Sequence, residues 1–406
     1  MIAGLCSQPA ICNNIDNINN INMNVLLSLS SFWSRVCSRL HLGKWSKYPS
    51  YWMVRVGVKP KVNFDSVQEA DTFLQSLHPD PASSALCHNK VISPAEYDLQ
   101  VVIPVYKVEQ FLDACLQSVL GQKTKYKFHI VAVDDGSPDK CGEILTKYEA
   151  DNRLSVIRQQ NRGLSGARNS GMSIINARYV TFLDSDDMLA QGAIEKLLDA
   201  AYKHNADIVE GSYKRRTVRG KLWGGETALY EGISSRKSLT GYPWMKVIKA
   251  ELLKNIHFPE RYWYEDTIMG MLVIPLAKRV ALIKDDVYYY TYNKDSISFV
   301  AAKNPKNIDG IYITRSLLSD AKRCGALEAA PDYQYHHYLQ QIRNNRCRSL
   351  WLGPDIELAM FTISCDLWSE YFSSGYVCSK PNLKNMELAL KNRDFNLFRK
   401  TCYIDF

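Results

Sequence analysis

The sequence predicts an α/β protein with a mainly parallel β-sheet that is covered by helices on both faces. Short apolar segments of strand length alternate with helix-length segments between residues 96 and 300, as expected where helical crossovers connect parallel strands. Several apolar segments end in carboxylates or at a proline. Ligands of such sheets bind outside the carboxyl ends of the strands, so these ends are the candidate functional site.

The composition is that of an ordinary globular protein and leaves few special classes open. The chain has 406 residues, of which 46% are hydrophobic and 23% charged, enough for about two or three domains. No apolar run reaches the roughly 18 residues of a membrane-spanning helix. The net charge of +8 favours anionic partners in general. We find no dense basic stripe or recognition module, so we expect no nucleic-acid partner.

Residues 1–95 are predicted to be an N-terminal extension with a disordered start, an amphipathic helix and a linker. The Asn-rich residues 13–22 disfavour regular structure, and Met23 after them is a candidate initiator. Apolar residues recur every three or four positions over 26–40, beside basic side chains. Such a helix either lies on an anionic membrane surface or docks on the next domain, and both alternatives stay open.

The cysteines bear on the compartment. There are 11, scattered along the chain without the spacing of a disulfide or zinc motif, which indicates a reducing compartment. We therefore expect a cytoplasmic protein, which the amphipathic helix would hold peripherally on the inner face of the cytoplasmic membrane if it binds lipid.

The catalytic domain is expected over residues 96–300. Strands are predicted at residues 99–105, 128–133 and 179–183 and from residue 207, and helices at 111–120 and 193–202. A C-terminal helical region is predicted over residues 301–406, with helices at 308–324, 335–351 and 356–372. The C-terminal region has no catalytic constellation of its own.

The first two strands end in residues suited to binding a ligand. Pro104 lacks a ladder donor, so the chain must leave the sheet there and open a loop. The second strand ends in Asp134 and Asp135, followed by Gly136. Two carboxylates there suit hydrogen bonding to a base or a sugar. An Asx-turn leading into the next helix explains them equally well.

The third strand ends in three carboxylates, Asp184, Asp186 and Asp187. Like charges held together at the mouth of a buried sheet are costly unless a cation compensates them. Mg²⁺ and Mn²⁺ prefer carboxylate oxygens and share them with phosphates. The pattern predicts a metal–diphosphate site, with a solvated acidic turn as the alternative.

With these motifs in place, residues 97–298 resemble the family 2 glycosyltransferases, which have the GT-A nucleotide-sugar-binding fold. The motifs that carry the resemblance, in order, are Val102-Ile103-Pro104-Val105-Tyr106, Val133-Asp134-Asp135-Gly136-Ser137, Asn161-Arg162-Gly163-Leu164-Ser165-Gly166-Ala167-Arg168-Asn169, Asp184-Ser185-Asp186-Asp187, Trp244-Met245-Lys246, Tyr264-Glu265-Asp266 and Tyr288-Tyr289-Tyr290.

The resemblance implies an inverting, metal-dependent glycosyltransferase of envelope polysaccharide synthesis. It implies a nucleotide-sugar donor, such as a UDP-sugar, and a glycan or lipid-linked glycan acceptor. The implied nucleoside pocket is lined by Pro104, Tyr106 and Asp135.

Further donor-side roles follow from the same resemblance. Asp184 would lie near the ribose, and Asp186 would bind Mg²⁺ or Mn²⁺. Arg168 would face the donor phosphate or sugar, with a structural salt bridge as the alternative. The role of Arg162 stays open, because the family commonly has a small residue there.

On the acceptor side, the resemblance makes Asp266 the candidate general base that takes the proton of the acceptor hydroxyl. Glu265 beside it would raise the proton affinity of that base by repulsion. Alternatively, both acidic residues only begin a helix over residues 268–276, where they favour its dipole. Trp244 and Trp263 are candidate contacts for the acceptor sugar, or ordinary core residues.

Two other functions remain as alternatives. A sugar nucleotidyltransferase also binds nucleotide, metal and sugar, but it would need a glycine-rich loop after the first strand, and residues 104–109 contain no glycine. A non-catalytic glycan- or nucleotide-binding protein on the same fold would not need the carboxylates Asp184, Asp186 and Asp266, which are all present.

Overall fold

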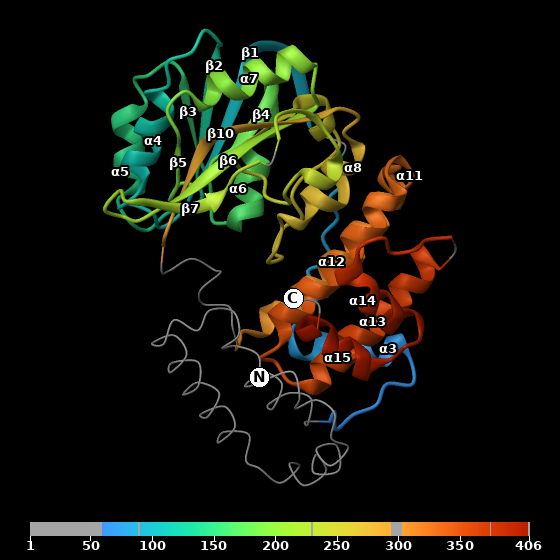
Figure 1. Cartoon of the computed structure of the whole chain (residues 1–406). Helices are drawn as coiled ribbons and strands as arrows, with labels where there is room; N and C mark the ends of the chain where they lie inside the picture. Colours follow the sequence, from blue (N-terminus) through green and yellow to red (C-terminus); the bar gives the residue numbers. More distant parts are fainter. Residues whose placement is uncertain (1–58, 88–89, 229, 294–302, 374, 405–406) are drawn as a thin grey trace, which may run out of the picture. The chain divides into compact units, whose positions relative to one another are not determined.

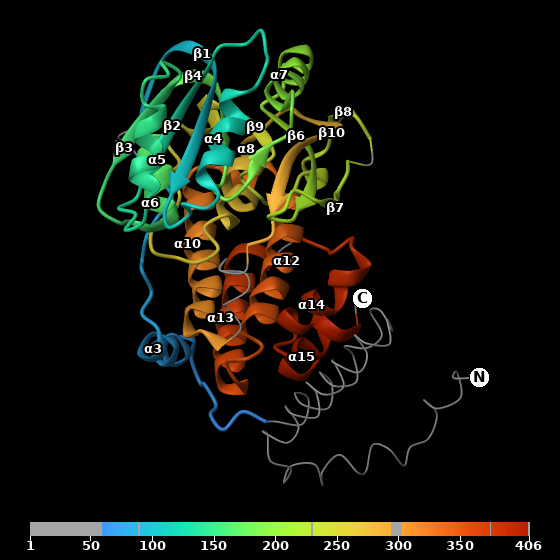
Figure 2. The same ribbon diagram turned by 90° about the vertical axis from the view of Figure 1, so that its left-hand side faces the viewer.

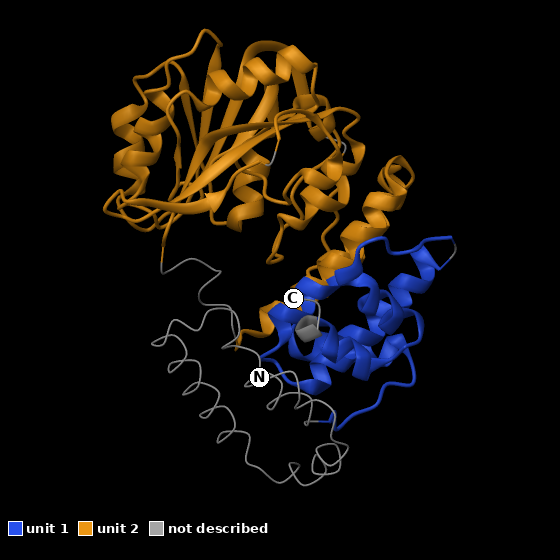
Figure 3. Ribbon diagram, in the orientation of Figure 1, with its two compact units in different colours: residues 1–78, 342–406 blue, residues 79–341 orange. Residues whose placement is uncertain are grey.

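The structure is a computed structural model that describes residues 59–87, 90–228, 230–293, 303–373 and 375–404. It divides into two compact units (Figure 3), one of residues 79–341 and one of residues 1–78 with 342–406. The predicted disordered start and amphipathic helix lie outside the described residues. The predicted domain limits at residues 95 and 300 stay predictions.

The unit of residues 79–341 is built on one mixed sheet, shown in Figure 1. Within the described residues it has 10 strands, in the order β3-β2-β1-β4-β9-β6-β10-β5, with β7 paired to β6 and β8 paired to β10. The strands are β1 Val91–Val105, β2 Phe128–Asp134, β3 Leu154–Arg158, β4 Ile174–Phe182, β5 Met188–Leu189, β6 Ile208–Arg216, β7 Leu222–Glu226, β8 Gly232–Ser234, β9 Lys246–Lys249 and β10 Val280–Thr291.

The strand directions bring the ends of the main strands to one edge of the sheet. Strands β1, β2, β3 and β4 are mutually parallel, and β10 is parallel to β6. Because β9 is antiparallel to both β4 and β6, β6 runs in the direction of β4. The carboxyl ends of β1, β2, β4, β6 and β10 therefore share one edge, as the arrows of β1 and β10 in Figure 2 illustrate.

Helices cover both faces of the sheet, as predicted. The helical segments of this unit are α4 Leu112–Leu120, α5 Cys141–Tyr148, α6 Gly163–Gly171, α7 Ala193–His204, η3 Arg236–Ser238, η4 Ala250–Leu253, η5 Met269–Val273, α8 Ile274–Leu276, η7 Pro305–Ile308, α10 Asp309–Arg323 and α11 Ala326–Ala329. Val101 and Ile103 of β1 pack in the core with α4, α5 and α7, whereas Val102 between them faces α6. This alternation is the two-residue period of a strand.

Helix α6 packs unusually close to β1. A Cβ atom at Gly171 would lie 2.4 Å from Cγ1 of Val102 and 3.3 Å from Cγ2 of Val133, so the position needs glycine. The same helix carries Arg168, whose guanidinium reaches Asp184 just beyond β4. Gly171, which follows the motif at 161–169, thus allows helix α6 to approach the sheet this closely.

The other unit is helical where it is described. It contains α3 Val67–Leu77, α13 Pro354–Phe372, α14 Pro381–Lys391 and α15 Phe395–Ile404, while α12 Pro331–Ser349 contributes residues to both units. The N-cap of helix α3 is Ser66, whose Oγ accepts the backbone N–H of Glu69 at 3.2 Å. The predicted C-terminal helices are confirmed by α10, α12 and α13. None of the helices in the described part of the chain has the length and hydropathy of a membrane span.

Candidate functional site

The two carboxylates at the end of β2 make different contacts. Asp134 closes the predicted Asx-turn, whereas Asp135 is held by hydrogen bonds from the loop after β3. Asp134 Oδ1 accepts the backbone N–H of Ser137 at 2.9 Å, which is an Asx-turn. Asp135 is only 2% exposed. Its Oδ1 accepts the Gln159 side-chain amide at 2.7 Å and the Arg162 backbone N–H at 2.8 Å. The protein thus holds the Asp135 carboxylate in one fixed orientation.

The predicted nucleoside-pocket residues lie on adjacent strand ends. The backbone N–H of Asp135 donates to the carbonyl oxygen of Val105 at 3.0 Å, which joins the loops that follow β1 and β2. Pro104 is buried, whereas Tyr106 is 41% exposed. An exposed ring beside a fixed carboxylate suits stacking on a planar base whose edge the carboxylate recognises.

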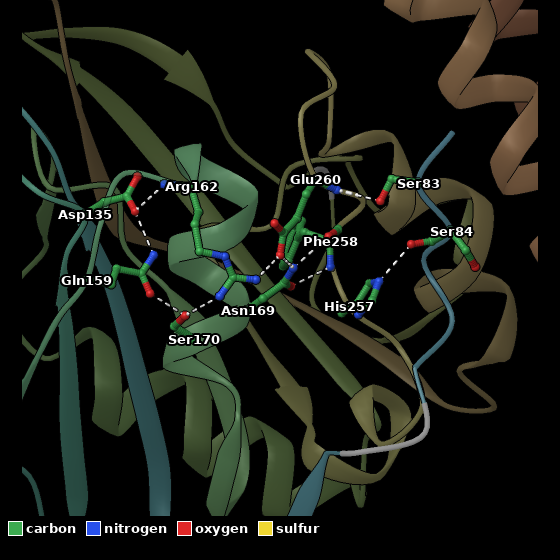
Figure 4. Close-up of polar contacts among 10 residues, drawn as sticks. All are labelled: Ser83, Ser84, Asp135, Gln159, Arg162, Asn169, Ser170, His257, Phe258 and Glu260. Atoms are coloured by element: carbon green, nitrogen blue, oxygen red, sulfur yellow. Dashed lines mark hydrogen bonds and ion pairs between the residues drawn. The ribbon is translucent and has the colours of Figure 1, made fainter. Parts of the chain in front are cut away.

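A polar network extends from Asp135 through α6 to residues 257–260 (Figure 4). Its members are Asp135, Gln159, Arg162, Asn169, Ser170, Phe258 and Glu260. The Asn169 amide donates to the Phe258 carbonyl oxygen at 2.8 Å and accepts its N–H at 2.7 Å. The guanidinium of Arg162 pairs with the carboxylate of Glu260. Arg162, whose role the sequence leaves open, therefore links the loop after β3 to the segment before Glu265.

Residues 83–86 hold this segment from its other side. Ser83 Oγ accepts the Glu260 N–H at 3.0 Å, and Nε2 of His257 lies 2.8 Å from the Ser84 carbonyl oxygen (Figure 4). Leu86 forms an isolated antiparallel bridge with Ile256. The segment before the candidate base is thus fixed on both sides, which sequence reasoning did not foresee, because residues 79–87 read only as a linker.

The carboxylates of the acidic cluster after β4 differ in their hydrogen-bond partners. Asp187 is 2% exposed. It accepts the Tyr288 hydroxyl at 2.7 Å and the Thr291 backbone N–H at 2.6 Å. Thr291 and Tyr288 therefore link β10 to this cluster. Asp186 Oδ2 accepts the side-chain amide of Asn293 at 3.0 Å.

The donor chemistry of the cluster fits a divalent cation. Burial raises the pKa of Asp186, and the charge of Asp184 raises it further although the bond from Asn293 lowers it. Burial and the charges of both neighbours raise the pKa of Asp187 well above its ordinary value. A cation would relieve this repulsion. Since the described residues form no cluster of three His, Cys, Asp or Glu side chains suited to a metal, Mg²⁺ or Mn²⁺ would take further ligands from a diphosphate and water.

Arg168 joins the donor side of the site to the candidate base. Its side chain is 2% exposed, with Nη2 at 2.7 Å from Asp184 Oδ1 and Nη1 at 2.7 Å from Glu265 Oε1. Burial alone would lower its pKa, but the two carboxylates raise it above the ordinary value. A guanidinium so enclosed favours the salt-bridge alternative over direct contact with a donor phosphate.

The candidate base follows a strained turn. Tyr264 has a φ of +66°, a left-handed conformation that a non-glycine residue rarely adopts outside functional sites. Asp266 is partly exposed, whereas Glu265 is enclosed beside Arg168. Burial raises the pKa of Glu265, Arg168 lowers it, and the charge of Asp266 raises it again. The two carboxylates therefore interact, while the predicted effect of Glu265 on the proton affinity of Asp266 stays a prediction.

The helix predicted at 268–276 is present, in part as a π-helix. Residues Met269–Val273 form the π-helical turn η5, and α8 continues from it. Glu265 and Asp266 precede this helix, so their favourable placement at a helix start holds alongside any catalytic role. Turns of this kind are frequent at functional sites.

The aromatic residues near the site form a stack. Trp244 is 7% exposed and lies between Tyr242 and Tyr288, with both ring centroids at 4.6 Å. Its core alternative is therefore favoured over contact with an acceptor sugar. Tyr242, 38% exposed, presents the outer ring of this stack. Trp263 remains partly exposed and keeps both interpretations.

Comparisons with known proteins identify the family and the fold of the chain. Residues 100–258 match the sequence profile of "Glycosyl transferase family 2". Glycosyltransferase GlyA of Streptococcus pneumoniae serotype 4 is 32% identical over 221 residues, which are 50% of this chain and 32% of GlyA. Glycosyltransferase GlyG of the same organism is 31% identical over 218 residues, 49% of this chain and 72% of GlyG. The minor teichoic acid biosynthesis protein GgaB of Bacillus subtilis is 30% identical over 242 residues, 56% of this chain and 26% of GgaB.

Among solved structures, the chain is similar to residues 1–349 of Staphylococcus aureus TarS in complex with UDP-GlcNAc. The TM-score is 0.60 at 21% identity, and the match covers 75% of this chain and 90% of the TarS chain. At this identity the likeness concerns the fold, and it confirms the predicted GT-A architecture. The chain spans about a third of GlyA and about a quarter of GgaB, but most of GlyG.

Proposed function

The chain belongs to glycosyl transferase family 2, and from that premise we propose that it moves a sugar from a nucleotide-sugar donor of the UDP-sugar class to a glycan or lipid-linked glycan of the cell envelope. The transfer inverts the anomeric carbon and depends on a divalent metal ion. The envelope role is inferred from the relatives named for teichoic acid synthesis.

One observation carries the proposal. The buried guanidinium of Arg168 lies 2.7 Å from Asp184 on the donor side and 2.7 Å from Glu265, the neighbour of Asp266. Donor-binding carboxylates and the candidate base are therefore held in one rigid arrangement at the carboxyl edge of the sheet. Inverting transfer needs this arrangement, because base and leaving nucleotide must act on opposite sides of one anomeric carbon.

Each residue of the site has a separate role in this transfer. Asp135, with Pro104 and Tyr106, holds the nucleoside, and Asp184 holds the ribose. Asp266 accepts the proton of the acceptor hydroxyl as that oxygen bonds to the anomeric carbon. As that bond forms, the bond from the anomeric carbon to the diphosphate oxygen breaks, and its electron pair leaves with the nucleoside diphosphate.

Asp186 would hold Mg²⁺ or Mn²⁺ at the diphosphate. When bound, the cation supplies positive charge beside the oxygens that become more negative as the leaving group departs. Asn293 orients the Asp186 carboxylate through its 3.0 Å hydrogen bond. Burial at this point excludes water and strengthens these interactions.

A thermal-shift screen tests the proposal. Nucleoside diphosphates and their sugars are added with and without Mn²⁺, and a ligand that binds the folded state must raise the melting temperature. We expect UDP with Mn²⁺ to raise it, and Asp186→Ala to remove the Mn²⁺-dependent part while leaving the unliganded melting temperature nearly unchanged. A metal-independent response in both proteins would contradict the metal assignment. The absence of any response to nucleotides would contradict the function.

A further inference from the structure

Three side chains form a row across neighbouring strands at the edge of the sheet. Trp223 of β7 is paired with Arg215 of β6, and Arg215 is paired with Tyr290 of β10. Residues directly opposite each other on adjacent strands project from the same face. The row therefore places an arginine between two aromatic residues on one face of the sheet. Trp223 is 37% exposed, and Arg215 is exposed as well.

The inner end of this row reaches the candidate active site. Tyr290 packs on Trp244 with ring centroids 5.8 Å apart, and Trp244 stacks on Tyr242. Burial, followed by the charges of the acidic cluster of residues 184–187, raises the pKa of Tyr290 to about 12. Asp266 contributes to the raised pKa of Tyr242, for which burial is the main cause. The row thus runs from an exposed sheet edge to the aromatic stack of Trp244 and Tyr288, whose hydroxyl donates to Asp187 of the acidic cluster.

Two of the three residues, Arg215 and Trp223, belong to a strongly basic hairpin, which we define as residues 214–223. It contains five cationic side chains and no carboxylate, namely Lys214, Arg215, Arg216, Arg219 and Lys221. Lys214 lies 3.8 Å from Asp286. In the part of the chain that the structure describes, Arg215 forms no ion pair. Because β6 ends at the same edge of the sheet as β4, the hairpin begins where the site lies.

We propose that the row Trp223–Arg215–Tyr290 is an acceptor subsite for an anionic glycan whose units are joined by phosphodiester groups. The guanidinium of Arg215 matches the geometry of a phosphate and forms charge-assisted hydrogen bonds with it. The two aromatic faces pack on the apolar faces of the sugar or polyol units on either side. This alternation of aromatic, cation and aromatic groups has the same order as a chain of sugar, phosphate and sugar.

The subsite rests on the proposed function, since it supplies the acceptor to Asp266. A polymer and a membrane surface would depend on different residues of the hairpin. A lipid surface would depend on the total charge of the hairpin, including Arg219 in its turn. Binding of a polymer along the row would depend on Arg215 and Trp223, and much less on Arg219, which lies outside the row.

The test compares Arg215→Gln and Trp223→Ala with Arg219→Gln, a control that removes the same charge from an exposed position of the same hairpin. Binding of a short poly(glycerol phosphate) oligomer and of a neutral oligosaccharide is measured by calorimetry without donor. Transfer to both acceptors is measured separately. We expect Arg215→Gln to weaken binding of the phosphate oligomer and raise its KM by about 10-fold. We expect Trp223→Ala to have a smaller effect, and Arg219→Gln to change either value less than about 2-fold.

The outcomes separate the subsite from the function. If transfer proceeds and Arg215→Gln behaves as the wild type, or if Arg215→Gln and Arg219→Gln weaken binding equally, the subsite is refuted while the function stands. If no sugar is transferred but calorimetry shows binding that depends on Arg215, the function and the acceptor role fail, while binding of the phosphodiester chain at the row stands. Binding to vesicles of phosphatidylcholine and phosphatidylserine without binding of the oligomer would assign the hairpin to a lipid surface and overturn the proposal.

Discussion

Replacing Arg168 by glutamine should destabilise the protein far more than the same change at Arg162. Arg168 is 2% exposed and is paired with two carboxylates, Asp184 and Glu265. Removing one partner from a buried ion pair costs about 3–5 kcal/mol, because the remaining charge has no compensation. Arg162 is 49% exposed and is paired with Glu260, and an exposed pair contributes about 0–1 kcal/mol.

The pH dependence follows from Glu265. Burial raises its pKa above the ordinary value of 4.5. The stability that its proton binding provides is therefore fully present below that value and is lost as the pH rises through the raised pKa. The Arg168 guanidinium lowers the pKa of Glu265. Its removal therefore raises that pKa further and increases the stability that is lost as the pH rises. We expect the difference in unfolding free energy between Arg168→Gln and the wild type to shrink when the pH is lowered from about 7 to about 5.

The assay is equilibrium unfolding in urea at both pH values, with donor titration on the folded proteins. Adding Glu265→Gln to Arg168→Gln should recover part of the lost stability, which a double-mutant cycle measures. Equal and small losses for Arg168→Gln and Arg162→Gln would refute the reasoning. A deficit that grows toward acidic pH would refute it as well.

Two further predictions concern the strand ends. Asp187→Asn should flatten the pH dependence of stability between about pH 5 and 7, because the raised pKa of Asp187 makes the wild type lose stability as the pH rises; urea unfolding of both proteins checks this, and unchanged slopes would contradict it. Gly136→Ala should cost about 1–2 kcal/mol and weaken donor binding, because Gly136 has a φ of +71° and its Cβ would lie 3.2 Å from backbone atoms. Gly241→Ala, with nothing within 4 Å, is the control, and equal losses at both glycines would contradict the prediction.

The sequence predicts the fold class well, because long apolar strands and amphipathic helices depend on local patterns. Strand β2 and helices α4 and α7 lie within about two residues of their predicted limits, whereas β1 and β4 end where predicted but begin at Val91 and Ile174, well before their predicted starts at residues 99 and 179. Short strands such as β7, with two consecutive glycines, have no local pattern. Their pairing is decided by distant neighbours.

The site was only partly predictable. Motifs indicate which carboxylates matter, but not which partner each one takes. Asp134 and Asp135 are adjacent in the sequence and have different roles, since one closes a turn and the other accepts from Gln159 and Arg162. Arg168 reaches Glu265 across 97 residues of sequence, a contact that only the tertiary structure determines.

The most direct test of the account is single-turnover transfer by Asp266→Asn beside Glu265→Gln. Asparagine keeps the size of the side chain but cannot take up the acceptor proton. We therefore expect a loss in rate of at least about 100-fold with donor affinity unchanged, and a milder loss for Glu265→Gln. Near-normal turnover by Asp266→Asn with an inactive Glu265→Gln would exchange the two roles. Loss of donor affinity together with early melting in both variants would mean that the pair only begins a helix, and would contradict the account.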